Sequence, residues 1–169
     1  AAARIVLDQE PETRFVIVGD TNSGYYADYY QQLIDLIDSL GMCERVIFQG
    51  FMRNPEEIYP QMDVFVVPSL REPFGMVLLE AMAFSKPVVA TNIGGPQDIV
   101  TDQTGILVPV NDPAALGAAI LRLIHDQQLR KDMGNAGRER VETYFTMEKA
   151  LARLYEIYDD LLCRKPEVS

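Results

Sequence analysis

Two patterns of apolar and polar residues alternate along most of the chain. Short apolar runs, typical of strands buried on both faces, are separated by segments in which apolar residues recur every three or four positions, as in helices. The runs predict strands at residues 15–18, 46–48, 64–67, 87–91 and 105–109. Strands that alternate with helices in this way indicate an α/β fold with a doubly wound, Rossmann-like parallel sheet.

The stretch from residue 64 to residue 95 is the most informative, and it reads VFVVPSLREPFGMVLLEAMAFSKPVVATNIGG. A strand, a polar loop at 68–75, a segment of good helix formers at 76–83 and a second strand predict one βαβ unit. Because the helical segment is apolar on nearly every side, we expect it to be sandwiched inside the molecule.

Two carboxylates interrupt this apolar stretch. Glu72 lies in the loop, and Glu80 is the single charge of the helical segment, with no cation one turn away. A buried polar group without a partner costs about 2–7 kcal/mol, so Glu80 is expected to face a cleft and a hydroxylated partner. Gly75 leaves room for a ligand beside unpaired N–H groups at the helix start, where the helix dipole favours a phosphate. These features together predict a site for a sugar nucleotide.

The same residues resemble a known family. The segments EPFGMVLLEAMA at 72–83, KPVVAT at 86–91 and Gly94-Gly95 resemble the Glu-x7-Glu signature of the family-4 (group 1) retaining glycosyltransferases, and the resemblance runs from about residue 15 to residue 162. It implies the two-domain GT-B architecture. Residues 1–169 would then be a single donor-binding domain, the carboxy-terminal one, with the acceptor domain absent from this chain.

The resemblance also implies roles for individual residues. Glu72 would be the catalytic-site residue that hydrogen-bonds hydroxyls of the donor sugar, and Glu80 would accept hydrogen bonds from the ribose hydroxyls. The other donor-binding residues would be Phe51 and Met52 near the base, Phe74, Gly75, Met76 and Val77 around the diphosphate and sugar, and Gly19. Two positions depart from the family pattern: Asp98 replaces a usual glutamate, and Ser85 stands where glycine is common.

A metal or a redox cofactor is not expected. The sequence has no paired His or Cys with metal-ligand spacing, and none of its glycines forms a G-x-G-x-x-G fingerprint. The family needs no metal, and a nucleotide sugar would serve as substrate. The single histidine, His125, falls late in a polar helical segment and is expected at the surface.

Composition narrows the class of partner. With 169 residues, 48% of them apolar, the chain suits one domain with a core of its own. A net charge of −10 argues against nucleic acid or an anionic membrane as a partner of this segment. Two distant cysteines, no signal peptide and no apolar run of transmembrane length indicate the cytoplasm, and a peripheral membrane location of the full-length parent is compatible with this.

The amino terminus departs from the family. The family's donor domain starts with a strand and a loop bearing an Arg and a Lys, whereas residues 1–8 resemble the end of the helix that follows. In a sheet of order 3-2-1-4-5-6 the missing first strand is central, so strands 15–18 and 64–67 should be separated and have unpaired edges. We therefore expect no sugar transfer by this chain alone, and we expect the gap to be filled by self-association with a neighbouring copy or by a rearranged element.

Five further helices are predicted. One short helix is expected at 55–62 and another after Gly95; Asp112 should cap a third, and a polar helix should cover 129–144. In the last helix, capped by Thr146, the stripe of Leu151, Leu154, Tyr158 and Leu161 is expected to lie in the core rather than at an interface.

Other classes share parts of this pattern. A non-catalytic sugar-nucleotide sensor would use the same residues, and a GT-B epimerase or phosphorylase domain would share the architecture but not the Glu-Pro-Phe-Gly sequence in this form. A receiver-type signalling domain is also acidic and doubly wound, but it would need paired acidic residues after its first strand and a Lys after its last, which this chain lacks.

Overall fold

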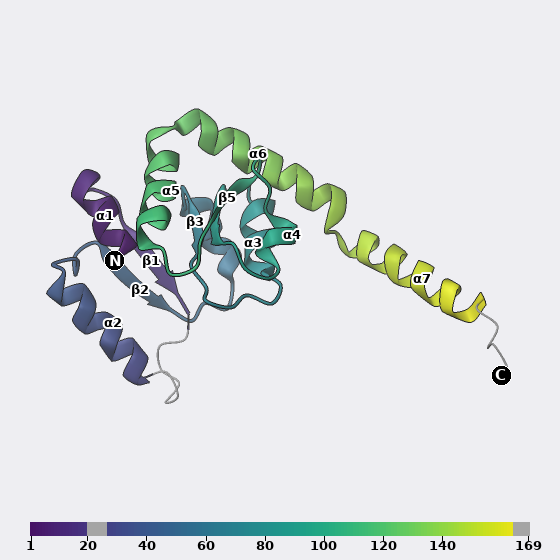
Figure 1. The fold of residues 1–169 in the computed structure, drawn as a ribbon, viewed down its shortest axis with the longest axis horizontal. Coiled ribbons are helices and arrows are strands. Elements are labelled where there is room, and N and C mark those ends of the chain that lie inside the picture. Colours follow the sequence, from purple (N-terminus) through teal and green to yellow (C-terminus); the bar gives the residue numbers. More distant parts are fainter. Residues whose placement is uncertain (20–26, 164–169) are drawn as a thin grey trace.

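A computed structural model describes residues 1–19 and 27–163 as an α/β body from which one helix projects (Figure 1). The strands are β1 (Phe15–Val18), β2 (Val46–Gly50), β3 (Phe65–Val67), β4 (Val88–Thr91) and β5 (Gly105–Val108). The α-helices are α1 (Ala2–Gln9), α2 (Ala27–Ser39), α3 (Met76–Ala83), α4 (Pro96–Ile99), α5 (Pro113–His125), α6 (Gln127–Tyr144) and α7 (Met147–Cys163). Two short 3-10 helices, η1 (Pro55–Glu57) and η2 (Tyr59–Gln61), precede β3.

The strands form two parallel sheets. One contains β1 and β2, and the other has the order β3-β4-β5 with β4 in the centre. The parallel α/β prediction is therefore confirmed. The expected separation of strands 15–18 and 64–67 is confirmed as well, because β1 and β3 belong to different sheets. Self-association through the gap stays a prediction.

The core of the β3–β5 sheet lies on both of its faces. Val88 and Ala90 of β4 pack with Leu78 and Met82 of α3 on one face. Val89, which points to the opposite face, packs with Leu123 of α5 and with other buried residues of that cluster. The predicted sandwiching of residues 76–83 is confirmed for the inner part of α3, since Leu78, Ala81 and Met82 are fully buried.

Helix α1 connects the two sheets. Val6 is fully buried in the cluster that contains Val89 and Leu123, and its neighbour Leu7 packs with Val46 of β2. Close approach of α1 to α5 requires Gly117, because a Cβ there would lie 3.0 Å from the side chain of Ile5. The α1 helix thus contributes to the cluster between β4 and α5 and to the cluster beside β2.

Two local expectations about strands and helices are wrong. Residues 15–18 form the predicted strand, but it is not buried: Val16, Ile17 and Val18 are 42%, 39% and 39% exposed, because β2 is the one strand that pairs with β1 in the described residues. Residues 55–62 form η1 and η2 instead of one helix. Pro60 explains this difference, since a proline inside a helix removes an N–H donor and clashes with the preceding turn.

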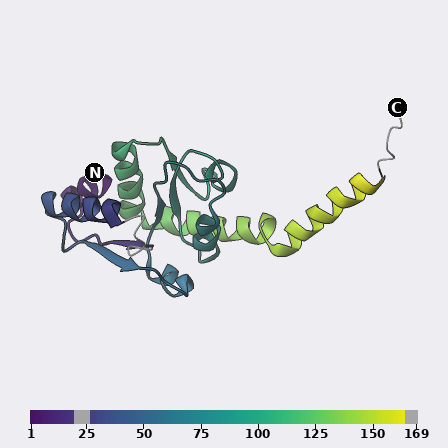
Figure 2. The same ribbon diagram turned by 90° about the horizontal axis from the view of Figure 1, so that it is seen from below.

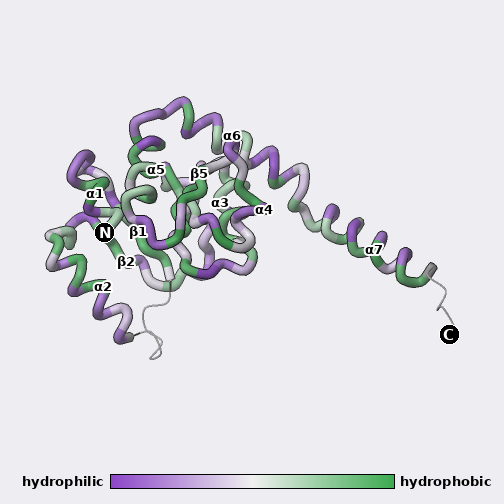
Figure 3. Tube along the Cα trace, viewed as in Figure 1, coloured by the Kyte–Doolittle hydropathy of each residue, from purple (hydrophilic) through white to green (hydrophobic). Residues whose placement is uncertain are grey.

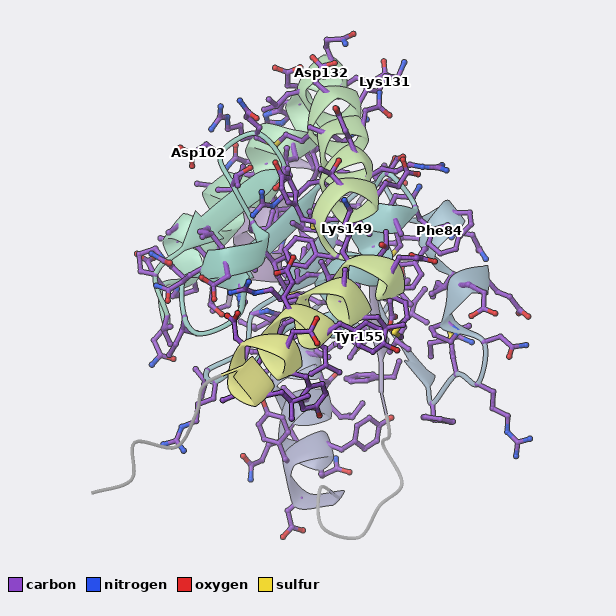
Figure 4. All side chains as sticks on the ribbon, turned by 90° about the vertical axis from the view of Figure 1, so that its right-hand side faces the viewer. Phe84, Asp102, Lys131, Asp132, Lys149 and Tyr155 are labelled. Carbon is purple, nitrogen blue, oxygen red and sulfur yellow. The ribbon has the colours of Figure 1, made fainter. Side chains whose placement is uncertain are left out.

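The α7 stripe does not lie in the core, contrary to expectation. Leu151, Leu154, Tyr158 and Leu161 are 43%, 42%, 53% and 59% exposed. Figures 1 and 2 show α7 leading away from the body in both views, and Figure 3 shows apolar and polar residues alternating along it. Tyr155, labelled in Figure 4, lies on this helix and is 66% exposed.

Two helices begin at the capping residues that the sequence predicts. The Asp112 carboxylate accepts a hydrogen bond from Ala115 N at 2.8 Å, and the Thr146 hydroxyl accepts one from Lys149 N at 3.3 Å, so both predicted caps are confirmed. Among residues 1–19 and 27–163, no helix combines the length and the apolar character needed to cross a membrane.

Candidate functional site

The loop between β3 and α3 is built against the turn that follows β4. The main-chain N–H of Gly95 donates to the carbonyl of Glu72 at 3.0 Å, and the Thr91 hydroxyl donates to the carbonyl of Ser69 at 2.6 Å. A Cβ at Gly94 would overlap the carbonyl oxygen of Glu72, and one at Gly95 would overlap that of Phe74. The two glycines therefore support the loop by allowing close approach of two backbones.

The amino end of α3 is left open by its glycine cap. Gly75 adopts a left-handed conformation with φ of 101°, and no side chain of the described residues caps the helix. By contrast, α5 is capped by Asp112 and α6 by Asp126, each accepting a hydrogen bond at 2.8 Å. The first N–H groups of a helix have no intrahelical partner, so the start of α3 presents free donors to an anion. Met76 and Val77, both predicted site residues, are 59% and 40% exposed there.

Glu72 lies beside this helix start. Its side chain is half-buried, and its Cγ would be 3.6 Å from a Cβ placed on Gly75. Phe74, between them, is 49% exposed. The structure therefore brings together the predicted residues at positions 72–77.

Glu80 is half-buried in the second turn of α3, and its partner is a tyrosine. The Tyr59 hydroxyl donates to Glu80 Oε2 at 2.7 Å, and Tyr59 is 4% exposed. Burial raises the pKa of Tyr59 above its usual value, and the hydrogen bond to the Glu80 carboxylate raises that pKa further, so the hydroxyl remains a donor at neutral pH.

Tyr59 was not among the residues predicted from the sequence. A partner for Glu80 was expected, but the neighbours considered within the chain were those one turn away on the same helix, whereas the donor comes from 21 residues earlier. The sequence around Tyr59, EEIYPQMD at 56–63, is mostly polar and therefore gave no signal that this phenol is buried and needs a hydrogen-bond partner.

The remaining predicted residues form a second group, at the carboxyl ends of β1 and β2. Gly19 N donates to the carbonyl of Gly50 at 3.0 Å, Phe51 is 73% exposed and Met52 is half-buried. Among the described residues, no hydrogen bond joins Gly19, Phe51 or Met52 to the first group, residues 72–80.

Three other positions singled out in the sequence have structural roles. The main-chain carbonyl of Asp98 accepts a hydrogen bond from Arg140 at 2.8 Å, which ties α4 to α6. Ser85 has a left-handed φ of 55° in the turn after α3. His125 lies at the surface, as expected, with Nε2 2.8 Å from Oε1 of Glu10.

A hollow of about 490 Å³ lies elsewhere, between α1 and the segment joining α2 to β2. Its lining includes Pro11 and Arg45, which precede β1 and β2, so it opens at the amino ends of these strands. Ligands of open α/β sheets bind at the carboxyl ends. None of the predicted site residues lines this hollow.

The fold and the site define an α/β protein with parallel strands and an open, glycine-capped helix start beside two carboxylates. The sequence model of the family described as "Glycosyl transferases group 1" matches residues 1–140. The chain therefore belongs to the group 1 glycosyl transferases.

Curated relatives support this assignment. The chain is 33% identical over 163 residues to N-acetyl-alpha-D-glucosaminyl L-malate synthase of Bacillus anthracis, an alignment that covers 96% of the chain and 41% of the relative. It is 35% identical over 162 residues to D-inositol 3-phosphate glycosyltransferase of Corynebacterium diphtheriae, covering 92% of the chain and 37% of the relative. The chain thus spans less than half the length of these relatives.

Solved structures show the same fold. Sucrose-phosphate synthase of Thermosynechococcus elongatus matches with a TM-score of 0.84 and 32% identity, over 95% of this chain and 41% of that one. Anabaena HepE, solved in complex with UDP, matches with a TM-score of 0.85 and 27% identity, over 92% of this chain and 44% of that one.

Proposed function

We propose that this chain is the nucleotide-sugar-binding part of a retaining glycosyltransferase, which moves a sugar from a nucleoside diphosphate to a lipid, glycan or small acceptor. The observation that carries the proposal is the uncapped start of α3 beside Glu72, with Glu80 one turn further along the same helix. The UDP complex of the related Anabaena protein supports a nucleotide as the kind of ligand.

Each part of the site would bind one part of the donor. Main-chain N–H groups of Phe74–Val77 would hold the diphosphate, and stabilising the charge that develops on it would be the main catalytic contribution. Glu72 would accept hydrogen bonds from sugar hydroxyls, and Glu80 from ribose hydroxyls. The exposed Phe51 and its neighbours Met52 and Gly19 would border the base.

Calorimetric titration with UDP-, GDP- and ADP-sugars tests donor binding. We expect one of the three series to bind and Glu80→Gln to weaken that binding about tenfold or more, since hydrogen bonds to a charged group contribute about 1.5–3 kcal/mol. Glu142→Gln is the matched control, because Glu142 pairs with Arg138 on α6 and is exposed.

The thermal unfolding midpoint should be the same for the wild type and both variants. Equal donor affinity in Glu80→Gln and Glu142→Gln would contradict the proposed role of Glu80. Sugar transfer by the full-length parent, measured with the donor that binds, distinguishes a transferase from a non-catalytic sensor.

A further inference from the structure

We propose that Tyr59 is a positioning residue for nucleotide binding, which holds the Glu80 carboxylate in the orientation that receives the ribose diol. This inference rests on the proposed function of Glu80. Its basis is the 2.7 Å hydrogen bond from the Tyr59 hydroxyl to Glu80 Oε2, made by a side chain that is 4% exposed.

The Tyr59 ring is fixed by contacts around it. It stacks on Phe84 with ring centroids 5.3 Å apart and an interplanar angle of 19°, and it meets Phe65 edge-on at 5.6 Å. The next residue, Pro60, accepts a hydrogen bond from Lys86 Nζ at 3.1 Å, which ties η2 to the segment after α3. Phe84, labelled in Figure 4, and Lys86 both lie just beyond the end of α3, so the tyrosine is held by the helix that carries Glu80.

The Glu80 carboxylate can accept hydrogen bonds from Tyr59 and from a ligand at the same time. A carboxylate has two oxygens and about four acceptor sites, and one of those on Oε2 is taken by Tyr59. Oε1 has no hydrogen-bond partner among the described residues and remains for a ligand. A half-buried carboxylate with one oxygen fixed loses less conformational freedom when a diol binds. Tyr59 should therefore strengthen the discrimination between a ribose diol and a sugar that lacks it.

The test compares a nucleoside diphosphate with its 2′,3′-dideoxy form as probes of the diol, by calorimetry on the full chain. UDP and dideoxy-UDP are the pair if the uridine series binds, and the GDP or ADP pair takes their place if that series binds. Tyr59→Phe keeps the ring and its stacking on Phe84 but removes the hydroxyl. We expect it to weaken binding of the nucleoside diphosphate about tenfold and to leave binding of the dideoxy form unchanged, so that the affinity ratio shrinks. Tyr30→Phe is the control, because Tyr30 packs edge-on against Phe48 at 4.9 Å on the other sheet, and it should keep the wild-type ratio.

A second comparison separates this inference from the proposed function. Glu80→Gln should abolish the preference for the nucleoside diphosphate over its dideoxy form, and Tyr59→Phe combined with Glu80→Gln should lose no more than Glu80→Gln alone. If Glu80→Gln abolishes the preference and Tyr59→Phe keeps it, the inference on Tyr59 is wrong and the function stands. If Tyr59→Phe weakens both probes equally, Tyr59 has a structural role alone and the inference is also wrong. An unchanged ratio in Glu80→Gln, or a wild type that binds no nucleoside diphosphate, would overturn both proposals.

Discussion

At the residue scale, Glu80 and Ser85 each depend on something outside their own side chain: Glu80 accepts a hydrogen bond from Tyr59 at 2.7 Å, and Ser85 has a left-handed φ of 55°. The sequence showed that Glu80 needs a polar partner, because desolvation of a carboxylate on a buried helix is costly. It did not identify Tyr59, since the contact joins η2 to α3 across 21 residues. In the same way, the sequence marked Ser85 as unusual for the family, and the structure adds the reason, a left-handed φ of 55°.

Replacing Ser85 with glycine should stabilise the protein. A left-handed conformation costs about 1–2 kcal/mol for a residue with a Cβ, and part of the gain is offset by the larger entropy of an unfolded chain with glycine. We expect a net increase of about 0.5–1 kcal/mol in the free energy of unfolding, measured by urea denaturation.

Asn111→Gly is the matched control, because Asn111 has a similar φ of 58°. Asparagine tolerates this region better than serine does, so its replacement should gain less. A Ser85→Gly variant that is less stable than the wild type would show that the turn depends on the serine side chain.

At the scale of elements, the spacing of apolar residues predicted whether most segments are strands or helices. It did not predict what packs beside them. Apolar runs gave the strands, but burial of β1 depends on what lies beside it, which its own four residues do not encode. Periodicity also could not show that Pro60 divides residues 55–62 into two short turns. The contact between the β3–α3 loop and the turn after β4 was missed too, since Gly94-Gly95 was noted as part of the family resemblance and not as a point of close packing.

Gly95→Ala tests that contact. The added methyl group would overlap the carbonyl oxygen of Phe74, so we expect a loss of about 1–3 kcal/mol in the free energy of unfolding. Because the displaced loop carries Glu72 and the start of α3, donor affinity should fall as well.

Gly19→Ala is the control for stability, because a Cβ there meets no atom of residues 1–17 or 27–163 within 4 Å. Its free energy of unfolding should change by no more than about 0.5 kcal/mol. Equal unfolding midpoints for the Gly95 and Gly19 variants would show that the two loops are not in close contact.

At the scale of the whole molecule, the sequence predicted the separation of the two sheets but not the position of α7. The separation followed from strand order, which the βαβ pattern and the family resemblance supply. The position of α7 did not follow from its amphipathic stripe, because such a stripe shows that a face is apolar without showing what covers it. In the structure every described side chain of residues 147–162 is exposed.

Deleting residues 147–169 should therefore leave the body nearly as stable as before. An element with no buried side chains contributes little to global stability, and we expect a change of less than about 1 kcal/mol in the free energy of unfolding. The comparison is deletion of residues 127–169, which also removes α6 with buried Met133, Gly134 and Gly137 and should unfold the body. A large loss on the shorter deletion would show that α7 packs against the body in solution.

The contrasting positions of α1 and α7 also decide how the protein should be attached to a sensor surface. An immobilisation tag before Ala1 would begin next to a helix that packs against both sheets, where a linker could disturb Val6 and Leu7. A tag after the last residue would begin beyond α7, which leads away from the body (Figure 1). Tethering through the carboxyl end should keep the open start of α3 accessible to injected nucleotides.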